Sequence, residues 1–249
     1  MMKIRITTVL LVLSVIALCV SGGFLYLKIQ ENAAAATALV EIRGMKPELP
    51  ELPDLTAPRD GLPPLPLMDF TGIKAENPDI IAWLTVPDTV IDYPVVQAKD
   101  NEAYLHTDAK KHANKNGALF LDYRVHADFS DFNSVIYGHH MKSGAMFQNL
   151  IKFKEQAFWD SHWFATLCTP EHTYILEFIA VAVIRPDSGL YRYAFASPSG
   201  RTAHLEEIRS AAKFYRDAGM TGDDRIVTLS TCSYEFNDAR TVVIAKLCE

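Results

Sequence analysis

Cysteine is scarce in this chain, and long clusters of lysine or arginine are missing. Four cysteines in 249 residues are too few and too scattered for a disulfide framework. The formal net charge is −6, whereas affinity for nucleic acid comes largely from basic side chains that neutralise phosphates. These shortages argue against a disulfide-stapled scaffold and against a nucleic-acid partner.

Metal-binding motifs are missing as well. The sequence has neither an HExxH motif nor a pair of CxxC motifs, which are common signatures of zinc sites. His139 and His140 are adjacent and are the one zinc-ligand alternative that the sequence leaves open. We expect neither a metal nor another cofactor.

The cysteines themselves allow at most one bridge outside the amino-terminal segment. Cys19 lies in an apolar run, which leaves Cys168, Cys232 and Cys248. At least one of these three therefore has no partner within the chain. A bridge between Cys168 and Cys248 stays open, because the sequence does not fix their separation in space.

A long apolar segment lies near the amino terminus. No charged residue occurs from Thr7 to Leu27, and a helix of that length, at about 1.5 Å per residue, matches the roughly 30 Å hydrocarbon core of a membrane. Lys3 and Arg5 precede it, so the positive-inside rule places the amino terminus in the cytoplasm and the rest of the chain outside. A cleaved secretory signal is the alternative, with small residues at 33–36, but its apolar run would be only about 7–15 residues long. We expect residues 1–28 to be a cytoplasmic tip and a single transmembrane anchor.

Proline is concentrated in the segment that follows. Seven of the 13 prolines lie between Met45 and Pro66, and such a run favours extended polyproline geometry. We predict that residues 29–68 form an extracellular stalk, with the alternative that part of it wraps the surface of a folded domain. Residues 69–249 can bury a sizeable core and should fold as one domain.

Short β-rich runs dominate after residue 69. Their Val, Ile, Tyr and Thr content and their separation by Asp, Asn, Gly and Pro are typical of strands. These runs are Ile80–Val86, Val90–Val96, Gly117–Asp122, Ser134–Gly138, Thr173–Ile184, Arg225–Thr231 and Arg240–Leu247. Many short strands with few helices predict a mainly β fold, a closed or nearly closed β-barrel with helical insertions.

Two helices are expected among these strands. The clearer one begins near Ser199, because apolar residues recur at helical spacing over 205–215, and Gly219 stands where a helix would stop. A shorter helix follows Ser143, with residues 146–151 contributing its apolar side.

Cys232 and Arg240 are the side chains that point to chemistry. They end and begin the last two predicted strands, which the loop from Ser233 to Ala239 can join as a hairpin. The two side chains should be neighbours at one end of the sheet, on faces that the sequence does not fix. An arginine stays charged in a protein, and it can stabilise a thiolate and a developing oxyanion.

A catalytic thiol also needs a partner that exchanges its proton, and histidine suits this task. His139 follows a short apolar run and a glycine, which places it at a strand end, where loops form active sites. His140 should point elsewhere, because successive strand residues face opposite ways. The simpler readings are that Cys232 is a small core residue and that Arg240 is a solvated edge residue.

The order of these motifs resembles the class B sortases, transpeptidases of Gram-positive bacteria. The run Thr228–Cys232, with Arg240 after it and Tyr137–His139 before it, is similar to the sortase signature. Further blocks similar to class B are Asn77–Leu84, Ile91–Gln97, Asp100–Leu105, Gly117–Arg124 and Tyr137–Phe147. The resemblance runs from about Asp69 to the carboxyl end, which identifies residues 69–249 as a sortase-type catalytic domain.

The resemblance implies an eight-stranded barrel with a substantial late helix, which fits Thr202–Asp217. The cysteine and the arginine would lie on the last two strands, and the histidine on a loop after an earlier strand. Ser233 departs from the pattern, since some class B members carry an acidic residue there. The implied catalytic residues are His139, Cys232 and Arg240, and the positions expected to line the groove for a sorting signal are Asn101, Leu105, Tyr137 and Ser230.

The function implied is that of a membrane-anchored cysteine transpeptidase. Such an enzyme cleaves a carboxyl-terminal sorting signal at a threonine carbonyl through a thioacyl-enzyme and transfers the protein to an amine. The implied partners are secreted proteins that bear the signal, and a lipid-linked cell-wall peptide precursor or a pilin amine. The alternatives are a cysteine endopeptidase that uses water as the acceptor, and a non-catalytic surface-binding module on the same barrel.

Overall fold

The computed structural model describes residues 6–48 and 65–249, and the chain divides into two compact units, Met1–Glu41 and Ile42–Glu249. The first unit consists of most of helix α1, which runs from Ile6 to Gly44. Residues Thr8–Gly44 of this helix are long and apolar enough to cross a membrane, with a mean hydropathy of 2.5 in their most apolar window. The helix continues past the predicted anchor into the segment assigned to the stalk. Most of the proline run, residues 49–64, lies outside the described residues.

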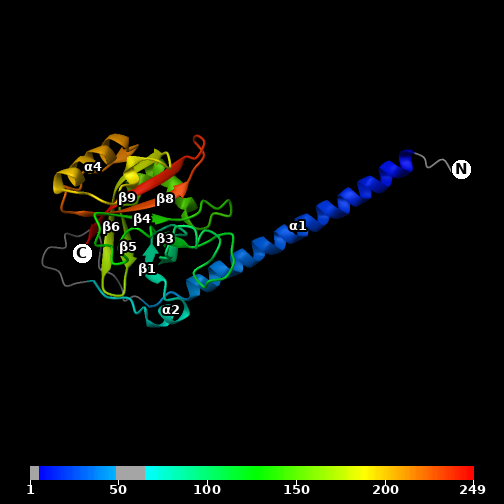
Figure 1. Ribbon diagram of the computed structural model, residues 1–249, viewed down its shortest axis with the longest axis horizontal. Coiled ribbons are helices and arrows are strands. Elements are labelled where there is room, and N and C mark those ends of the chain that lie inside the picture. The colour runs from blue at the N-terminus through cyan, green and yellow to red at the C-terminus, as the bar shows by residue number, and fades with distance from the viewer. Residues whose placement is uncertain (1–5, 49–64) are drawn as a thin grey trace. The chain divides into compact units, whose positions relative to one another are not determined.

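The second unit is built on a closed β-barrel (Figure 1). Eight strands form the ring β5-β1-β2-β3-β4-β8-β9-β6, which closes because β6 also pairs with β5. The pairs β2–β3 and β4–β8 are parallel, and the other pairs in the ring are antiparallel. The strands are β1 (Ile80–Thr85), β2 (Asp92–Val96), β3 (Leu119–Leu121), β4 (Asn133–Tyr137), β5 (Phe164–Cys168), β6 (Thr173–Ile184), β8 (Arg225–Cys232) and β9 (Arg240–Cys248), with the two-residue β7 (Phe214–Tyr215) paired to β6. The prediction of an eight-stranded barrel is confirmed.

One short helix precedes the first strand, and the others are inserted between strands. They are α2 (Thr71–Glu76), the 3-10 helices η1 (Phe147–Lys154) and η2 (Gly189–Tyr191), α3 (Gln156–Ser161) and α4 (Pro198–Ala211). The helix predicted after Ser143 is therefore η1, which begins at Phe147.

Helix α4 starts close to its predicted position and ends earlier than predicted. The Ser197 hydroxyl accepts a hydrogen bond from the Gly200 N–H, and proline stands in the first turn, so the amino-terminal signals act as expected. The predicted continuation through Tyr215 to a stop at Gly219 is wrong. Ala212 is extended, and β7 pairs with β6 directly afterwards. Pairing with the sheet outweighs the helical spacing of the apolar residues in this segment.

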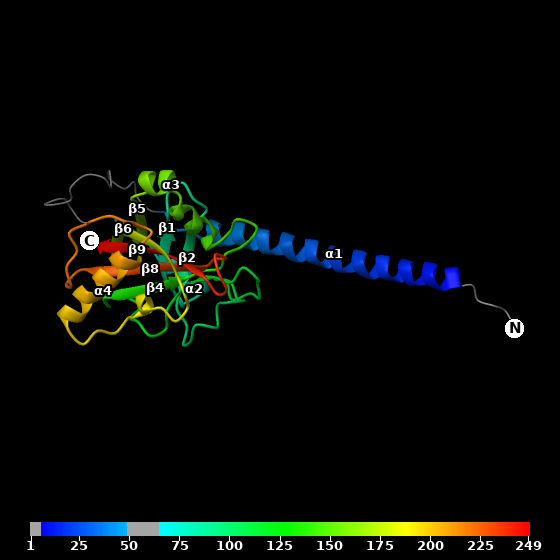
Figure 2. The same cartoon turned by 90° about the horizontal axis from the view of Figure 1, so that it is seen from above.

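Helix α4 covers the outside of the barrel beside β6 and β9, as two perpendicular views show (Figures 1 and 2). Its buried Leu205 and Ile208 pack in a cluster with Ala180 and Ala182 of β6 and Val242 of β9. β6 is therefore buried over most of its length on both faces, because one face lines the barrel interior and the other meets this helix. Such strands read as continuous apolar runs rather than as alternating ones.

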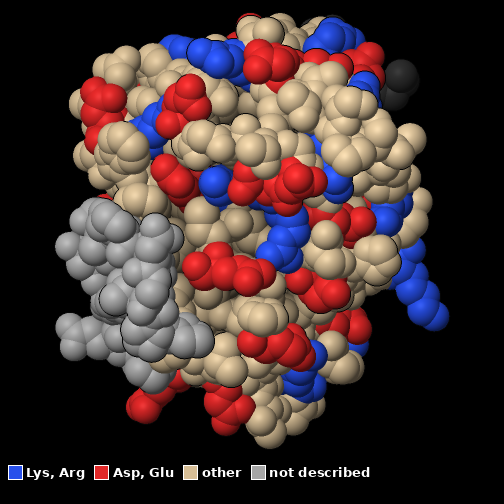
Figure 3. Space-filling model, turned by 90° about the vertical axis from the view of Figure 1, so that its left-hand side faces the viewer, with Lys and Arg blue, Asp and Glu red and all other residues tan. Residues whose placement is uncertain are grey.

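The surface of the second unit carries mixed charge. Figure 3 shows acidic and basic side chains interspersed over one face, without a broad basic area. This distribution agrees with the net charge of −6 and offers no stripe of cations for a phosphate backbone on that face.

Candidate active site

The antiparallel pairing of β8 and β9 brings the thiol and the guanidinium together. Cys232 and Arg240 are directly opposite each other in the ladder, as the last pair before the connecting loop. Directly opposite residues of an antiparallel pair project from the same face of a sheet. The structure thus fixes what the sequence left open, and it leaves the Cys232 side chain half-buried rather than sealed in the core.

A cavity of about 610 Å³ lies over this end of the hairpin. All seven residues that the sequence assigned to the site line it: Asn101, Leu105, Tyr137, His139, Ser230, Cys232 and Arg240. They come from β4 and the loop after it, from β8 and β9, and from the connection between β2 and β3. The fold therefore gathers around one cavity residues that are more than a hundred positions apart in the chain.

His139 reaches the cavity from the loop after β4. Gly138 makes this possible, because a Cβ there would lie 2.5 Å from the Leu119 Cδ2 and 2.7 Å from the Phe147 Cδ2. The His139 Nε2 lies 2.8 Å from the Leu105 carbonyl oxygen. A carbonyl oxygen only accepts, so Nε2 carries the proton and donates. In the neutral ring, Nδ1 is then the basic nitrogen.

The guanidinium of Arg240 is partly committed to its own loop. Its Nη1 donates to the carbonyl oxygens of Asp238 and Ala239 at 3.0 and 3.1 Å. Within the described residues, its Nε and Nη2 donate no hydrogen bond to protein. Those donors remain for a group bound in the cavity.

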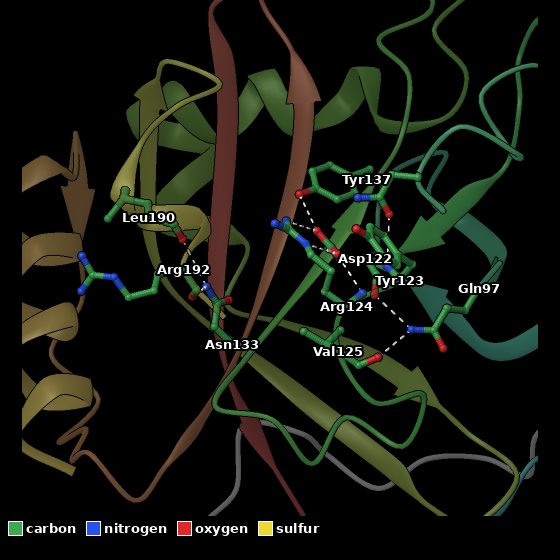
Figure 4. A network of polar contacts seen from close by, with 10 residues as sticks. Gln97, Asp122, Tyr123, Arg124, Val125, Asn133, Tyr137, Leu190 and Arg192 are labelled. Atoms are coloured by element: carbon green, nitrogen blue, oxygen red, sulfur yellow. Dashed lines mark hydrogen bonds and ion pairs between the residues drawn. The ribbon is translucent and has the colours of Figure 1, made fainter. Parts of the chain in front are cut away.

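A second arginine, Arg124, lines the cavity and forms an ion pair with the buried carboxylate of Asp122 (Figure 4). The Arg124 Nε and Nη2 donate to the two Asp122 oxygens at 2.8 and 2.6 Å, and the Tyr137 hydroxyl donates to Asp122 at 3.1 Å. Burial alone would raise the pKa of Asp122, but the hydrogen bonds from Arg124 outweigh it and hold this pKa below its usual value. Burial, together with the Asp122 charge, raises the pKa of Tyr137, so its hydroxyl stays protonated as a donor.

The segment after β6 supplies the facing wall of the cavity. The Tyr191 hydroxyl lies 2.7 Å from the Ser230 Oγ, and the Tyr193 ring stacks on Arg124 with 4.5 Å between the guanidinium carbon and the ring centroid. Asn133 of β4 donates to the carbonyl oxygens of Leu190 and Arg192, which fixes this segment against β4 (Figure 4). The sequence analysis did not assign these residues. Arg124 lay within a block similar to class B, but the Tyr-Arg-Tyr run had no signal beyond its aromatic content.

The other cysteines of the barrel are not equivalent to Cys232. Cys168 and Cys248 are both free thiols, so the bridge that the sequence left open is not formed. Burial raises the pKa of Cys168 and raises that of Cys248 to about 11. Neither lines the cavity. Among the described residues, no group of three or more His, Cys, Asp or Glu side chains is placed to hold a metal ion.

The fold and the cavity together define a class of protein. A closed β-barrel that gathers a thiol, an imidazole and a guanidinium around one cavity has the groups that acyl transfer through a thioester requires. The sequence model of the sortase domain matches residues 84–248, and the chain belongs to the sortase family. Members of this family are cysteine transpeptidases, so the alternative of a non-catalytic binding module is excluded.

Within that family, the similarity is to sortase B. Sortase B of Listeria monocytogenes is 35% identical over 181 residues, which cover 72% of this chain and 74% of that protein. The crystal structure of sortase B from Bacillus anthracis is 30% identical, with a TM-score of 0.75, and the match covers 89% of this chain and 99% of that one. A sortase B–substrate complex from Staphylococcus aureus is 28% identical, with a TM-score of 0.69, over 72% of this chain and 84% of that one.

Proposed function

We propose that Cys232 is the nucleophile of a transpeptidation reaction. It attacks the carbonyl of a threonine in a carboxyl-terminal sorting signal. Its thiolate, whose proton His139 has taken, attacks the carbonyl carbon, and the C–N bond of the signal breaks as the thioester forms. His139 gives a proton to the leaving amine. Arg240 holds the tetrahedral oxyanion, or the signal backbone, with the Nε and Nη2 donors that its own loop leaves available.

The second half of the reaction reverses these roles. An incoming amine attacks the thioester, His139 accepts a proton from it, and the C–S bond breaks to release Cys232. The observation that carries this proposal is the shared cavity, which is lined by the thiol, the imidazole and the guanidinium together. Asn101, Leu105, Tyr137 and Ser230 would contact the sorting signal.

We infer that both substrates meet at the outer face of a membrane. Helix α1 would be a single-pass anchor with the amino terminus in the cytoplasm and the barrel outside the cell. The first substrate is a secreted protein with a sorting signal, and the second is an amine of a lipid-linked cell-wall peptide or of a pilin. Anchoring the enzyme where both substrates are displayed raises their effective concentration.

A covalent trap tests the nucleophile. We expect a peptide chloromethyl ketone with threonine at the reacting carbonyl to add once to the wild-type chain and not to Cys232→Ala, as measured by intact mass. Cys168→Ala and Cys248→Ala are the matched controls and should retain the adduct, because burial keeps both thiols protonated at neutral pH. An adduct that persists in Cys232→Ala contradicts the assignment.

A transfer assay separates the transpeptidase from an endopeptidase that uses water. Sorting-signal peptides with a threonine carbonyl would be incubated with the enzyme, with or without triglycine or Nα-acetyl-lysine amide. We expect ligated product in at least one amine arm and faster turnover than with water alone. Cleavage that is indifferent to every amine would favour the hydrolytic alternative.

A further inference from the structure

His140 contacts the backbone of the residue proposed as the nucleophile. Its ring Nδ1 lies 2.9 Å from the carbonyl oxygen of Cys232. The carbonyl only accepts, so Nδ1 carries the proton and donates in both the neutral ring and the cation. His140 does not line the cavity, in keeping with the expectation that it points away from His139. It contacts the site through the backbone of Cys232 and not through the cavity.

The position of this hydrogen bond follows from the parallel pairing of β4 with β8. Tyr137 is the register partner of Ser230, and the Gly138 N–H donates to the Ser230 carbonyl at 3.1 Å. In a parallel ladder the next such bond would run from the backbone N–H of residue 140 to the carbonyl of Cys232. The chain has already left the strand there, because His140 forms an isolated antiparallel bridge with Met146. Its imidazole therefore makes the bond that its backbone does not.

The peptide unit after Cys232 is consequently held at both of its polar atoms. Its carbonyl accepts from His140, and its N–H, that of Ser233, donates to the Ala239 carbonyl at 2.8 Å. The orientation of this peptide fixes the backbone of Cys232, and so the direction of its Cα–Cβ bond, from which the side-chain rotamer places Sγ. Without the His140 bond, the one hydrogen bond that the described residues give to this peptide unit is the one to Ala239, just before β9.

The loop that carries His140 is itself firmly fixed. The Phe147 N–H donates to the His139 carbonyl at 3.0 Å, and Met146 adopts φ 56° and ψ −130°, a region that is costly for a residue other than glycine. On the outer side, the Tyr234 ring lies against the His140 ring, with 5.2 Å between their centroids. Because this loop is held at several points, its hydrogen bond through His140 can hold the end of β8 in one position.

We propose that His140 is a positioning residue for Cys232, one that extends the β4–β8 ladder by a side-chain hydrogen bond and so sets the thiol against His139. This inference rests on the proposed role of Cys232 as the nucleophile. We call the hydrogen bond from His140 Nδ1 to the Cys232 carbonyl the brace. His139 and His140 are consecutive residues, so one short segment supplies both the proton-transfer group and this brace. Misplacement of a reacting group by about 1 Å can cost on the order of a hundredfold in rate.

Three substitutions in the full chain test the brace. His140→Leu removes the donor, His140→Asn keeps an amide N–H near the position of Nδ1, and His172→Leu is the control at an exposed histidine in the β5–β6 turn. We expect His140→Leu to lower kcat for the threonine-containing signal peptide about tenfold to a hundredfold with KM within about twofold. His140→Asn should recover most of that loss, and His172→Leu should match the wild type. A kcat for His140→Leu within twofold of the wild type, or equal losses in the Leu and Asn variants, would overturn the proposal.

The tautomer gives a measurement that needs no turnover. Nitrogen-15 spectra of histidine-labelled protein distinguish a protonated from an unprotonated ring nitrogen, and we expect Nδ1 of His140 to be the protonated one at pH 8. An unprotonated Nδ1 would overturn the brace even if the enzyme were active. A wild-type chain with this tautomer but without transfer activity would instead contradict the proposed function, so the two failures are distinguishable. The spectrum and the Asn variant also decide the question if His140→Leu does not fold.

Discussion

At Arg240, a substitution can separate the effect of positive charge from that of the planar, multi-donor guanidinium group. Its Nη1 is engaged by two carbonyls of the loop, and its other donors remain for a bound group. A lysine at this position would keep the positive charge but would have one ammonium to share between the loop and the substrate. We predict that Arg240→Lys lowers kcat on the order of a hundredfold, as loss of an oxyanion donor does, with circular dichroism unchanged.

The control for this change lies at the other end of the same hairpin. Arg225 begins β8, outside the cavity, and donates to the Phe129 carbonyl and to Glu249. Arg225→Lys should leave kcat within about twofold, because exposed ion pairs contribute little. If both variants lose activity equally, the effect of Arg240→Lys is structural and the oxyanion role is contradicted.

The sequence predicted the site to different depths for different residues. The sequence predicted that Cys232 and Arg240 are neighbours, because a short loop between two strands indicates that the strands pair as a hairpin. It did not predict the role of His140, since that role depends on a hydrogen bond to Cys232, 92 positions further along the chain. Nor did it predict that of Arg124, whose place in the cavity wall depends on the Tyr193 ring from the segment after β6. A side chain that replaces one bond of a backbone ladder has no sequence signature of its own.

At the scale of elements, helix α4 carries a buried histidine that makes its docking sensitive to pH. His204 is fully buried between the Phe132 and Phe195 rings, and its Nδ1 lies 3.3 Å from the Glu207 Oε2. Burial lowers the pKa of His204, more strongly than Glu207 raises it. The folded state therefore resists a proton that the unfolded chain accepts near its ordinary pKa of about 6.5.

The sign of the pH dependence follows directly. Above about pH 6.5 both states are neutral at this residue, and its contribution to stability is fully present. As the pH falls below that value, the unfolded state binds a proton first, so the free energy of unfolding decreases until the lower folded-state pKa is passed. We predict that His204→Phe, which keeps a ring in place, becomes progressively more stable relative to the wild type between pH 7.5 and pH 5. Urea unfolding at several pH values measures this difference, and a difference that does not change with pH would contradict it.

The elements that the sequence predicted and those that it missed differ in how local their stabilisation is. Long apolar runs such as β6 and β8 were predicted nearly to their ends. β5, β7 and α3 were not predicted, because each has only two to six residues and is defined by its neighbours. β5 is the strand that closes the ring, through pairing with both β1 and β6. Closure is therefore a property of the tertiary fold that local patterns did not reveal.

At the scale of the whole molecule, the compact unit begins before the predicted domain boundary. Ile42 is buried in a cluster with Met68, Phe70 and Trp83, which ties it to the base of β1. The Arg43 Nη2 donates to the Val90 carbonyl and to the Tyr93 hydroxyl, each at 2.6 Å. The residues at the end of α1 thus belong to the barrel unit, and their contacts attach the start of this unit to β1 and β2.

This attachment predicts that the point of truncation decides the stability of a soluble barrel. A chain that starts at residue 42 keeps the burial of Ile42, the Arg43 bonds and the ion pair of Lys46 with Asp92 at 2.7 Å, whereas a chain that starts at residue 49 loses all three. Burial of one isoleucine is worth roughly 1.5–3 kcal/mol and each hydrogen bond about 1 kcal/mol. The entropy lost in ordering residues 42–48 offsets part of this sum, so we expect the shorter chain to unfold with a free energy roughly 2–4 kcal/mol lower, as measured by urea denaturation.

Point variants separate this fastening from a general effect of chain length. Ile42→Ala and Arg43→Ala in the chain that starts at residue 42 should each reproduce part of the loss, while Lys74→Ala, on the exposed side of α2, should not. The cavity lies among β4, β8 and β9 rather than against Ile42 or Arg43, so the cleavage rate per folded molecule should be the same in all of these chains. Equal stability of the two truncations would show that residues 42–48 contribute nothing to the barrel. A loss of activity without a loss of stability would show instead that they act on the site, which their contacts do not predict.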